Sequence, residues 1–418
     1  MKSPTNTLTI LQFLFSLLAA ATFFLLSAGM LVLVISGQLA ELTGSNGADA
    51  SALFIWVTAA AVFGILTLPS ALFALLSWIG KPYQGLKPSQ QLTTSKISFF
   101  LLVVVFPAAL ALGWVVSRHH WASMVALPPL HVLAVGIPVF WLAMVGLRGL
   151  PTGSPQRIWG VFSSGLVLGP AISILLEIIA GVLILITVVV ILSFDPEMMS
   201  NLERLTTLLE QTTNPDQMLE YGQAFLSNPW VITGIFLLIA VITPLIEETF
   251  KPIGVYLLLH RRISPAEGFA AGLLNGLGFA LFESMLVSAS SEEWLSTVLL
   301  RAPTAGLHGL TTALVGYGLA SAVTQRRYLR LVGCFSAAVL LHGVWNGLTL
   351  ISAGYSLQSA MSTNVIAIPG FVQIIPVILV FLAGMTFLGI ILINRRLKQA
   401  AATPDLEGKM NGVHLTVN

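Results

Sequence analysis

Long apolar runs constrain this chain more than any other feature. Of its 418 residues, 56% are hydrophobic and only 9% are charged, whereas a soluble domain carries about 25% charged residues. Several of the apolar runs exceed the roughly 18 residues that a helix needs to cross a lipid bilayer. We therefore predict an all-α, polytopic helical membrane protein.

The apolar runs predict about ten transmembrane helices. Some runs are longer than one crossing requires, so we expect tilted helices or an additional turn. The predicted spans cover residues 8–37, 52–79, 97–118, 121–147, 158–194, 230–259, 266–290, 294–323, 331–353 and 366–393.

Charged residues alternate in sign from one predicted loop to the next. The loops after the even-numbered spans hold the basic residues, such as Arg261 and Arg262 after the sixth span and Arg326 and Arg327 after the eighth. The acidic loop residues lie on the opposite side, in the loops after the first, fifth and seventh spans, the longest of which is 195–229, and Arg118 after the third span is the one exception to the pattern. Since basic loops remain on the cytoplasmic side, we predict that both termini are cytoplasmic.

The distribution of polar residues divides the chain into four parts. We predict an N-terminal five-helix membrane module (1–194), a polar extracytoplasmic loop with some helix (195–229), a catalytic-type membrane module (230–396) and a disordered cytoplasmic tail (397–418). Cys334 is the only cysteine, so the chain can form neither an internal disulfide nor a thiolate metal site. No sequence feature indicates nucleic-acid binding.

Ionisable side chains gather in the sixth to ninth spans, where they are costly and usually face the interior of a helix bundle, marking a functional site. Isolated residues elsewhere receive other interpretations: Glu177 is expected to be structural or substrate-gating, and His131 structural. The candidate catalytic residues are Glu247, Glu248, Glu283, His308, His342 and Asn346.

The sixth span combines charge with helix-breaking residues. Lys251 follows Glu247 by four positions and Glu248 by three, so it can support a carboxylate as an ion pair. Pro244 and Pro252 each lack a backbone N–H and free a carbonyl one turn earlier. In the seventh span, small residues recur every fourth position from Gly268, which allows close approach of another helix.

Two chemistries remain open for this set of residues. A glutamate can act as general base toward water, with imidazole or amide donors stabilising the oxyanion. Alternatively, Glu283, His308 and His342 can bind a metal ion such as Zn²⁺. The chief alternative to hydrolysis is a proton- or ion-coupled membrane transporter, because such transporters also use buried Glu and His residues.

Three short motifs resemble those of a known enzyme family. "EETFK" (Glu247 to Lys251) resembles the E-E-x-x-K motif of the PrsW family of intramembrane proteases, and "FALFE" (Phe279 to Glu283) resembles its F-x-x-x-E motif. "HGVWN" (His342 to Asn346) is similar to its last motif, in which many members have Asp at the position of Asn346. An H-x-x-x-N motif at this place is similar to the CAAX prenyl-endopeptidase group. The resemblance covers about residues 230–350.

The resemblance implies an intramembrane endopeptidase in a bacterial cell (inner) membrane. It implies a membrane-anchored protein substrate, such as an anti-sigma factor, and a water molecule activated by Glu247 or Glu248. The next candidates on the family pattern are Glu283, His308 and His342, with Asn346 as an oxyanion or orienting donor. Family members are described as metalloproteases, but Asn346 in place of Asp removes one carboxylate ligand, so the resemblance leaves the metal open.

Overall fold

The computed structural model describes residues 4–37, 50–81, 83, 96–97, 99–196, 199–200, 203–204, 206–207, 228–287, 293–361 and 369–413. Within these ranges the regular elements are all helices, which confirms the all-α prediction. Eight helices in this described part of the chain are long and apolar enough to cross a membrane, and the chain is an integral, multi-pass membrane protein. The eight cover Thr7–Ile35, Ser51–Trp78, Trp121–Gly146, Pro155–Leu192, Pro229–Arg261, Pro265–Leu286, Tyr328–Ser356 and Gly370–Ala400.

Two of the ten predicted spans are not among these eight. The segment predicted at 97–118 contains only a short apolar helix, formed by the π-turn η1 (Leu101–Val105) and α5 (Phe106–Val116). The segment predicted at 294–323 divides at Pro303 into α14 (Trp294–Arg301) and α15 (Thr304–Gln325). Glycine, threonine and serine lower the hydropathy of α15. The structure thus supports eight candidate spans, and the cytoplasmic placement of the termini stays a prediction.

The chain divides into two compact units. The first comprises residues 1–170, 251–338 and 383–418, and the second comprises 171–250 and 339–382. The predicted loop 195–229 lies largely outside the described residues. The last helix, α17 (Gly370–Val413), continues past residue 397, where the tail was predicted to begin. The four-part division made from the sequence stays a prediction.

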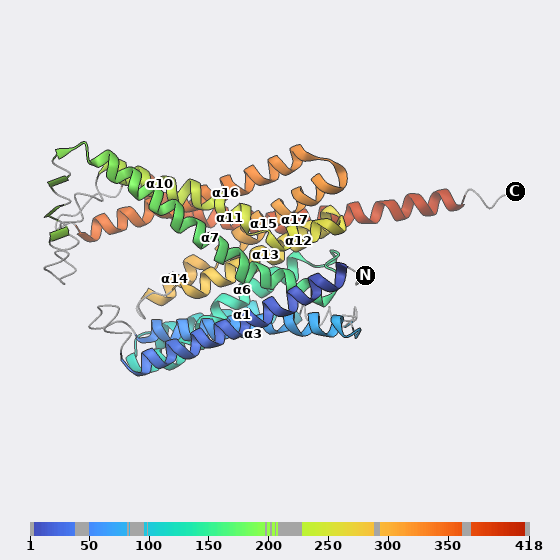
Figure 1. The fold of residues 1–418 in the computed structure, drawn as a ribbon, viewed down its shortest axis with the longest axis horizontal. Coiled ribbons are helices and arrows are strands. Elements are labelled where there is room, and N and C mark those ends of the chain that lie inside the picture. Colours follow the sequence, from blue (N-terminus) through green and yellow to red (C-terminus); the bar gives the residue numbers. More distant parts are fainter. Residues whose placement is uncertain are drawn as a thin grey trace. The chain divides into compact units, whose positions relative to one another are not determined.

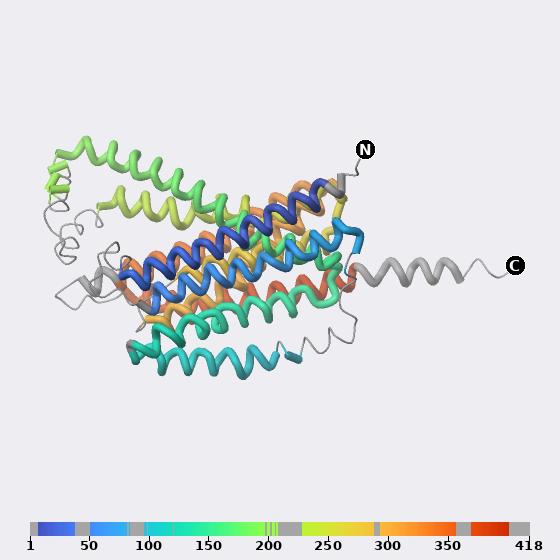
Figure 2. Tube along the Cα trace, turned by 60° about the horizontal axis from the view of Figure 1, so that its bottom comes forward, coloured from blue at the N-terminus to red at the C-terminus, as the bar shows by residue number. Residues whose placement is uncertain are grey.

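Two helix pairs form the framework of the first unit. Figures 1 and 2 show α1 (Pro4–Ile35) and α3 (Ala50–Trp78) side by side along their lengths. The second pair consists of α13 (Pro265–Leu286) and α15. Helix α6 (His120–Gly146) contacts α3 and α13, and so links the two pairs.

The small residues of α13 allow the close approach that the sequence predicts. A methyl group added at Gly268, Gly272 or Gly276 would collide with a backbone carbonyl oxygen of α15, at Gly316, Thr312 and His308 respectively. The two backbones therefore touch where glycine leaves room, as in other membrane helix pairs with small residues at four-residue spacing. The prediction of a close-packed helix face is confirmed, and α15 is the partner helix.

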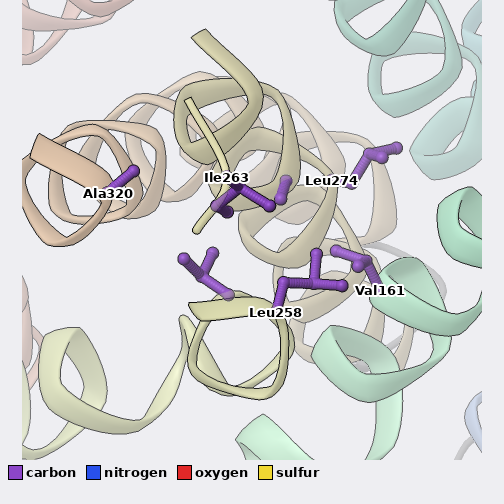
Figure 3. Packing of buried hydrophobic residues seen from close by; sticks show 7 residues of the cluster. Val161, Leu258, Ile263, Leu274 and Ala320 are labelled. Atoms are coloured by element: carbon purple, nitrogen blue, oxygen red, sulfur yellow. The ribbon is translucent and has the colours of Figure 1, made fainter. Parts of the chain in front are cut away.

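A cluster of buried apolar side chains packs α7 (Pro155–Leu192) and α12 (Ile253–Leu258) against the second helix pair. Figure 3 shows Val161 of α7, Leu258 of α12 and Ala320 of α15 around Ile263 and Leu274. All five are at most 9% exposed. This cluster ties α12, which follows the candidate catalytic segment, to α7, α13 and α15.

The second unit also packs through glycines. Its sixth-span segment comprises α10 (Pro229–Leu237), the π-turn η2 (Leu238–Ile242) and α11 (Thr243–Phe250). Gly234 faces Ile184 and Val188 of α7, and a methyl group at Gly343 of α16 (Tyr328–Met361) would lie 2.5 Å from the carbonyl oxygen of Ala240. These contacts bring α16 against the segment that carries Glu247 and Glu248.

Candidate active site

The helix that carries the two glutamates is distorted on both sides of them. In η2 the N–H of Thr243 donates to the carbonyl of Leu238, five residues earlier, so the hydrogen-bond register is shifted by one residue. After α11 the helix stops at Lys251 and Pro252 and resumes at Ile253. The irregular helix predicted from the two prolines is therefore present.

Asn346 satisfies a carbonyl that this distortion leaves free. In the shifted register, the next donor after Thr243 would be Pro244 bonding to Ile239, but proline has no N–H. The side-chain amide of Asn346 donates to the carbonyl of Ile239 over 3.1 Å instead. Asn346 thus stabilises the π-turn directly before the glutamates, and π-turns of this kind are frequent at functional sites.

One buried histidine lies between the two glutamates in the second unit. His342 Nδ1 is 2.9 Å from Glu248 Oε1, and His342 Nε2 is 3.8 Å from Glu247 Oε2. Glu248 is 0% exposed, His342 1% and Glu247 7%. A carboxylate only accepts, so the proton of a neutral His342 lies on Nδ1 and its lone pair on Nε2. The nitrogen on the Glu247 side can therefore bind a metal ion or a proton.

A second polar cluster lies in the first unit and is centred on His308. Its Nε2 is 2.7 Å from Glu283 Oε2, and its Nδ1 is 2.8 Å from Lys251 Nζ. The other oxygen of Glu283 is 2.8 Å from Arg301 Nη2. The ammonium group of Lys251 lies 4.6 Å from the ring centre of Phe279, within the range of a cation–π contact.

Comparison with protein families identifies the chain. Residues 169–385, just over half of it, match the PrsW family of intramembrane metalloproteases. The chain belongs to the PrsW family. No curated protein and no solved structure matches it. This PrsW protein is accordingly a peptide hydrolase in a lipid environment, whose substrate is a membrane-embedded protein, and the transporter alternative is not favoured.

The PrsW match is longer than the motifs indicate. The motifs place the resemblance within about residues 230–350, with nothing contributed by the first five spans, but the match begins at residue 169 inside α7. It therefore includes Glu177, which the motif region leaves out. This difference arises because short motifs detect only the polar site, whereas the apolar helices around it also belong to the family pattern.

The structure gathers the predicted site residues of this PrsW protein into two groups. Within the second unit it brings together Glu247, Glu248 and His342. Asn346 of α16 lies close by and donates to the carbonyl of Ile239 in η2. Within the first unit it brings together Lys251, Glu283 and His308. The predicted pairing of Lys251 with a glutamate of α11, and the assembly of all these residues into one site, stay predictions.

One residue of the His308 cluster, Arg301, is not among the site residues predicted from the sequence. Arg301 binds Glu283, yet it drew no attention among the basic residues. The available signal was its position, because it lies inside the apolar segment predicted at 294–323, where a charge is costly and marks function.

His131 is buried and accepts a hydrogen bond from the indole of Trp294 over 3.2 Å, and such a contact suits the structural role expected for it.

Proposed function

We propose that this PrsW protein hydrolyses a peptide bond of a membrane-anchored protein by means of water activated at Glu247. The observation that carries the proposal is the buried arrangement of Glu247, His342 and Glu248. A carboxylate in such a place needs a polar partner to remain charged. Intramembrane hydrolysis supplies a reason for keeping two carboxylates there.

The two glutamates have different tasks in this proposal. Glu248 accepts the Nδ1 proton of His342 and fixes the ring orientation, so that Nε2 is directed toward Glu247. Glu247 lies on the Nε2 side, where it accepts a proton from the attacking water as general base. Adjacent residues of a helix point about 100° apart, which is consistent with this division.

The donor groups fit a divalent metal ion, as the family description requires. Ligand atoms that share one tetrahedral Zn²⁺ at about 2.1 Å lie about 3.4 Å apart, and the 3.8 Å between Glu247 Oε2 and His342 Nε2 is close to this. We propose that Glu247 and His342, which are both buried, would hold the ion, with one oxygen of Glu247 as ligand and its other oxygen as the acceptor of the water proton. When bound, Zn²⁺ would polarise the scissile carbonyl and lower the pKa of water.

Glu283 is reassigned from candidate ligand to positioning residue in this proposal. Its two oxygens contact Arg301 and His308 Nε2, so it is suited to orient the ring of His308, as carboxylates commonly do for functional histidines. His308 Nδ1 lies 2.8 Å from Lys251 Nζ, so the ring is held at both nitrogens. Asn346 keeps an orienting role through its bond to Ile239.

The chain segment that joins the two clusters is short. Glu248 and Lys251 are separated by three peptide units, so their Cα atoms are at most about 11 Å apart. Lys251 in turn contacts His308 directly. We propose that both clusters act on one substrate.

The setting of the reaction is proposed from the family resemblance and the charge pattern. We propose a bacterial inner membrane, both termini in the cytoplasm and a substrate of the anti-sigma-factor type. The experiment would reconstitute the purified full chain with single-span membrane proteins and follow cleavage on gels, with metal content measured on the same sample. Glu247→Gln and His342→Ala should abolish cleavage, whereas Glu293→Gln, an exposed residue, should not.

The opposite result is equally clear. Cleavage that persisted in both variants would refute the assigned site. Cleavage by a sample without metal, unchanged by a chelator, would refute the metal. Proton-coupled uptake without any cleavage would instead support a transporter.

A further inference from the structure

A cavity of about 350 Å³ lies within the first unit, and none of the candidate catalytic residues lines it. Three segments enclose it: residues 8–16 of α1, residues 154–168 at the start of α7, and residues 254–261 of α12 and η3 (Leu259–Arg261). Its volume is within the range of small-molecule sites. Figure 3 shows two of its wall residues, Val161 and Leu258, from the adjoining apolar cluster.

The cavity is amphipathic along its length. At the helix ends it is lined by polar residues, including Gln156, Arg157 and Arg261. Deeper along the helices the lining includes Phe15 and Leu168. Leu168 follows Arg157 by eleven residues, or about 16 Å along a helix. A ligand that fills the cavity therefore needs a polar head and an apolar body.

Arg157 provides the main reason to expect an anionic head. Its side chain is 12% exposed, and Nη1 is 2.7 Å from Glu267 Oε1. Its Nε and Nη2 atoms are buried, and no acceptor in the described part of the chain bonds to them. Buried donors without acceptors are costly. The guanidinium fork matches the oxygens of a phosphate, which can accept from two N–H groups at once.

The rim around Arg157 is positive and already ordered. Arg261 is exposed at the same end, and its Nε donates to Nε2 of the neighbouring His260. Gln12 and Gln156 donate to each other across α1 and α7, over 3.0 and 3.1 Å. This pair fixes the two helices on either side of the opening, so the cavity does not depend on a ligand to form.

We propose that this cavity binds one anionic phospholipid of the surrounding membrane, with the phosphodiester on Arg157 and Arg261 and an acyl chain between α1, α7 and α12. Charge complementarity favours this occupant, and basic pockets between membrane helices commonly hold such headgroups. The apolar wall also continues to the outside of the unit, since Leu11 is 55% and Leu257 52% exposed. A lipid already in the bilayer can therefore enter sideways.

Native mass spectrometry of the detergent-purified full chain tests the proposal. The protein is titrated with phosphatidylglycerol, phosphatidylcholine or inorganic phosphate, and the retained adducts are counted. Wild type should retain one phosphatidylglycerol more tightly than phosphatidylcholine. A basic residue near the headgroup contributes about 1 kcal/mol, or about fivefold in affinity, so Arg157→Gln and Arg261→Gln should each lose about that factor.

The controls separate the headgroup contact from folding. Arg157→Lys keeps a charge for Glu267 but lacks the guanidinium fork, so it should also lose affinity while the protein stays folded. Arg327→Gln changes an exposed arginine away from the cavity and should bind as wild type does. Equal retention of both lipids by wild type, unchanged affinity in the Arg157 and Arg261 variants, or displacement of the lipid by inorganic phosphate would overturn the proposal.

Discussion

His342 Nδ1 lies 2.9 Å from Glu248 Oε1, and the two side chains are 1% and 0% exposed. The glutamate comes from α11 and the histidine from α16, so one hydrogen bond joins the two helices of the second unit that carry the site. The contact also fixes which ring nitrogen carries the proton. A substitution of similar size at Glu248 should therefore alter which nitrogen of His342 carries the proton, while the packing around the site is kept.

The first prediction concerns this contact. Glu248→Gln keeps the size of the side chain but supplies an amide whose NH₂ group competes with the histidine proton. We expect kcat to fall by about 100-fold or more, with metal affinity reduced about 10- to 100-fold, as for other residues that orient metal-binding histidines. Cleavage kinetics and metal titration measure the two effects. A Glu248→Gln protein with wild-type kcat would contradict the assigned role.

The second prediction concerns the π-turn. Asn346→Leu removes the donor for the Ile239 carbonyl and should destabilise the protein by about 1–3 kcal/mol, since an unsatisfied carbonyl remains. Thr349→Val is the matched control, because its hydroxyl bonds to carbonyls of its own helix turn. Thermal unfolding in detergent compares the midpoint temperatures of the two variants. If both variants unfold at the wild-type temperature, Asn346 does not stabilise the π-turn.

The third prediction concerns the contact of α13 with α15. A methyl group at Gly272 would collide with the backbone of Thr312, so Gly272→Ala should destabilise the protein by about 1–3 kcal/mol, as overpacking does. A methyl group added at Gly333 of α16 would have no other atom within 4 Å, so Gly333→Ala should not lower the free energy of unfolding. Chemical unfolding of both variants checks this, and equal stability of the two would argue against tight backbone contact.

Sequence reasoning worked best where a pattern depended on local spacing. The apolar runs predicted a helical membrane protein, and the glycines at four-residue spacing from Gly268 predicted a closely packed helix. The prolines at 244 and 252 predicted a distorted sixth span. Each of these features follows from properties of one helix, such as its length, one face or a missing N–H, so no knowledge of its neighbours was needed.

Contacts between helices could not be derived in this way. The sequence offered Asn346 as an oxyanion or orienting donor, but the π-turn that gives it a partner at Ile239 depends on a register shift that no local pattern reveals. The partners of Glu283 were equally hidden. Arg301 is eighteen residues away along the chain, and only the packing of α13, α14 and α15 brings it to this carboxylate.

The last prediction tests that arrangement. Arg301 holds one oxygen of Glu283 while the other contacts His308, so Arg301 is a positioning residue that acts through Glu283. Arg301→Gln should lower kcat/KM about tenfold with little change in KM, and Arg301→Lys should restore part of it. If the two residues act on His308 in series, adding Arg301→Gln to Glu283→Gln should cost little more than Glu283→Gln alone. Additive losses in this double-mutant cycle would show that Arg301 serves the fold or the substrate by another route.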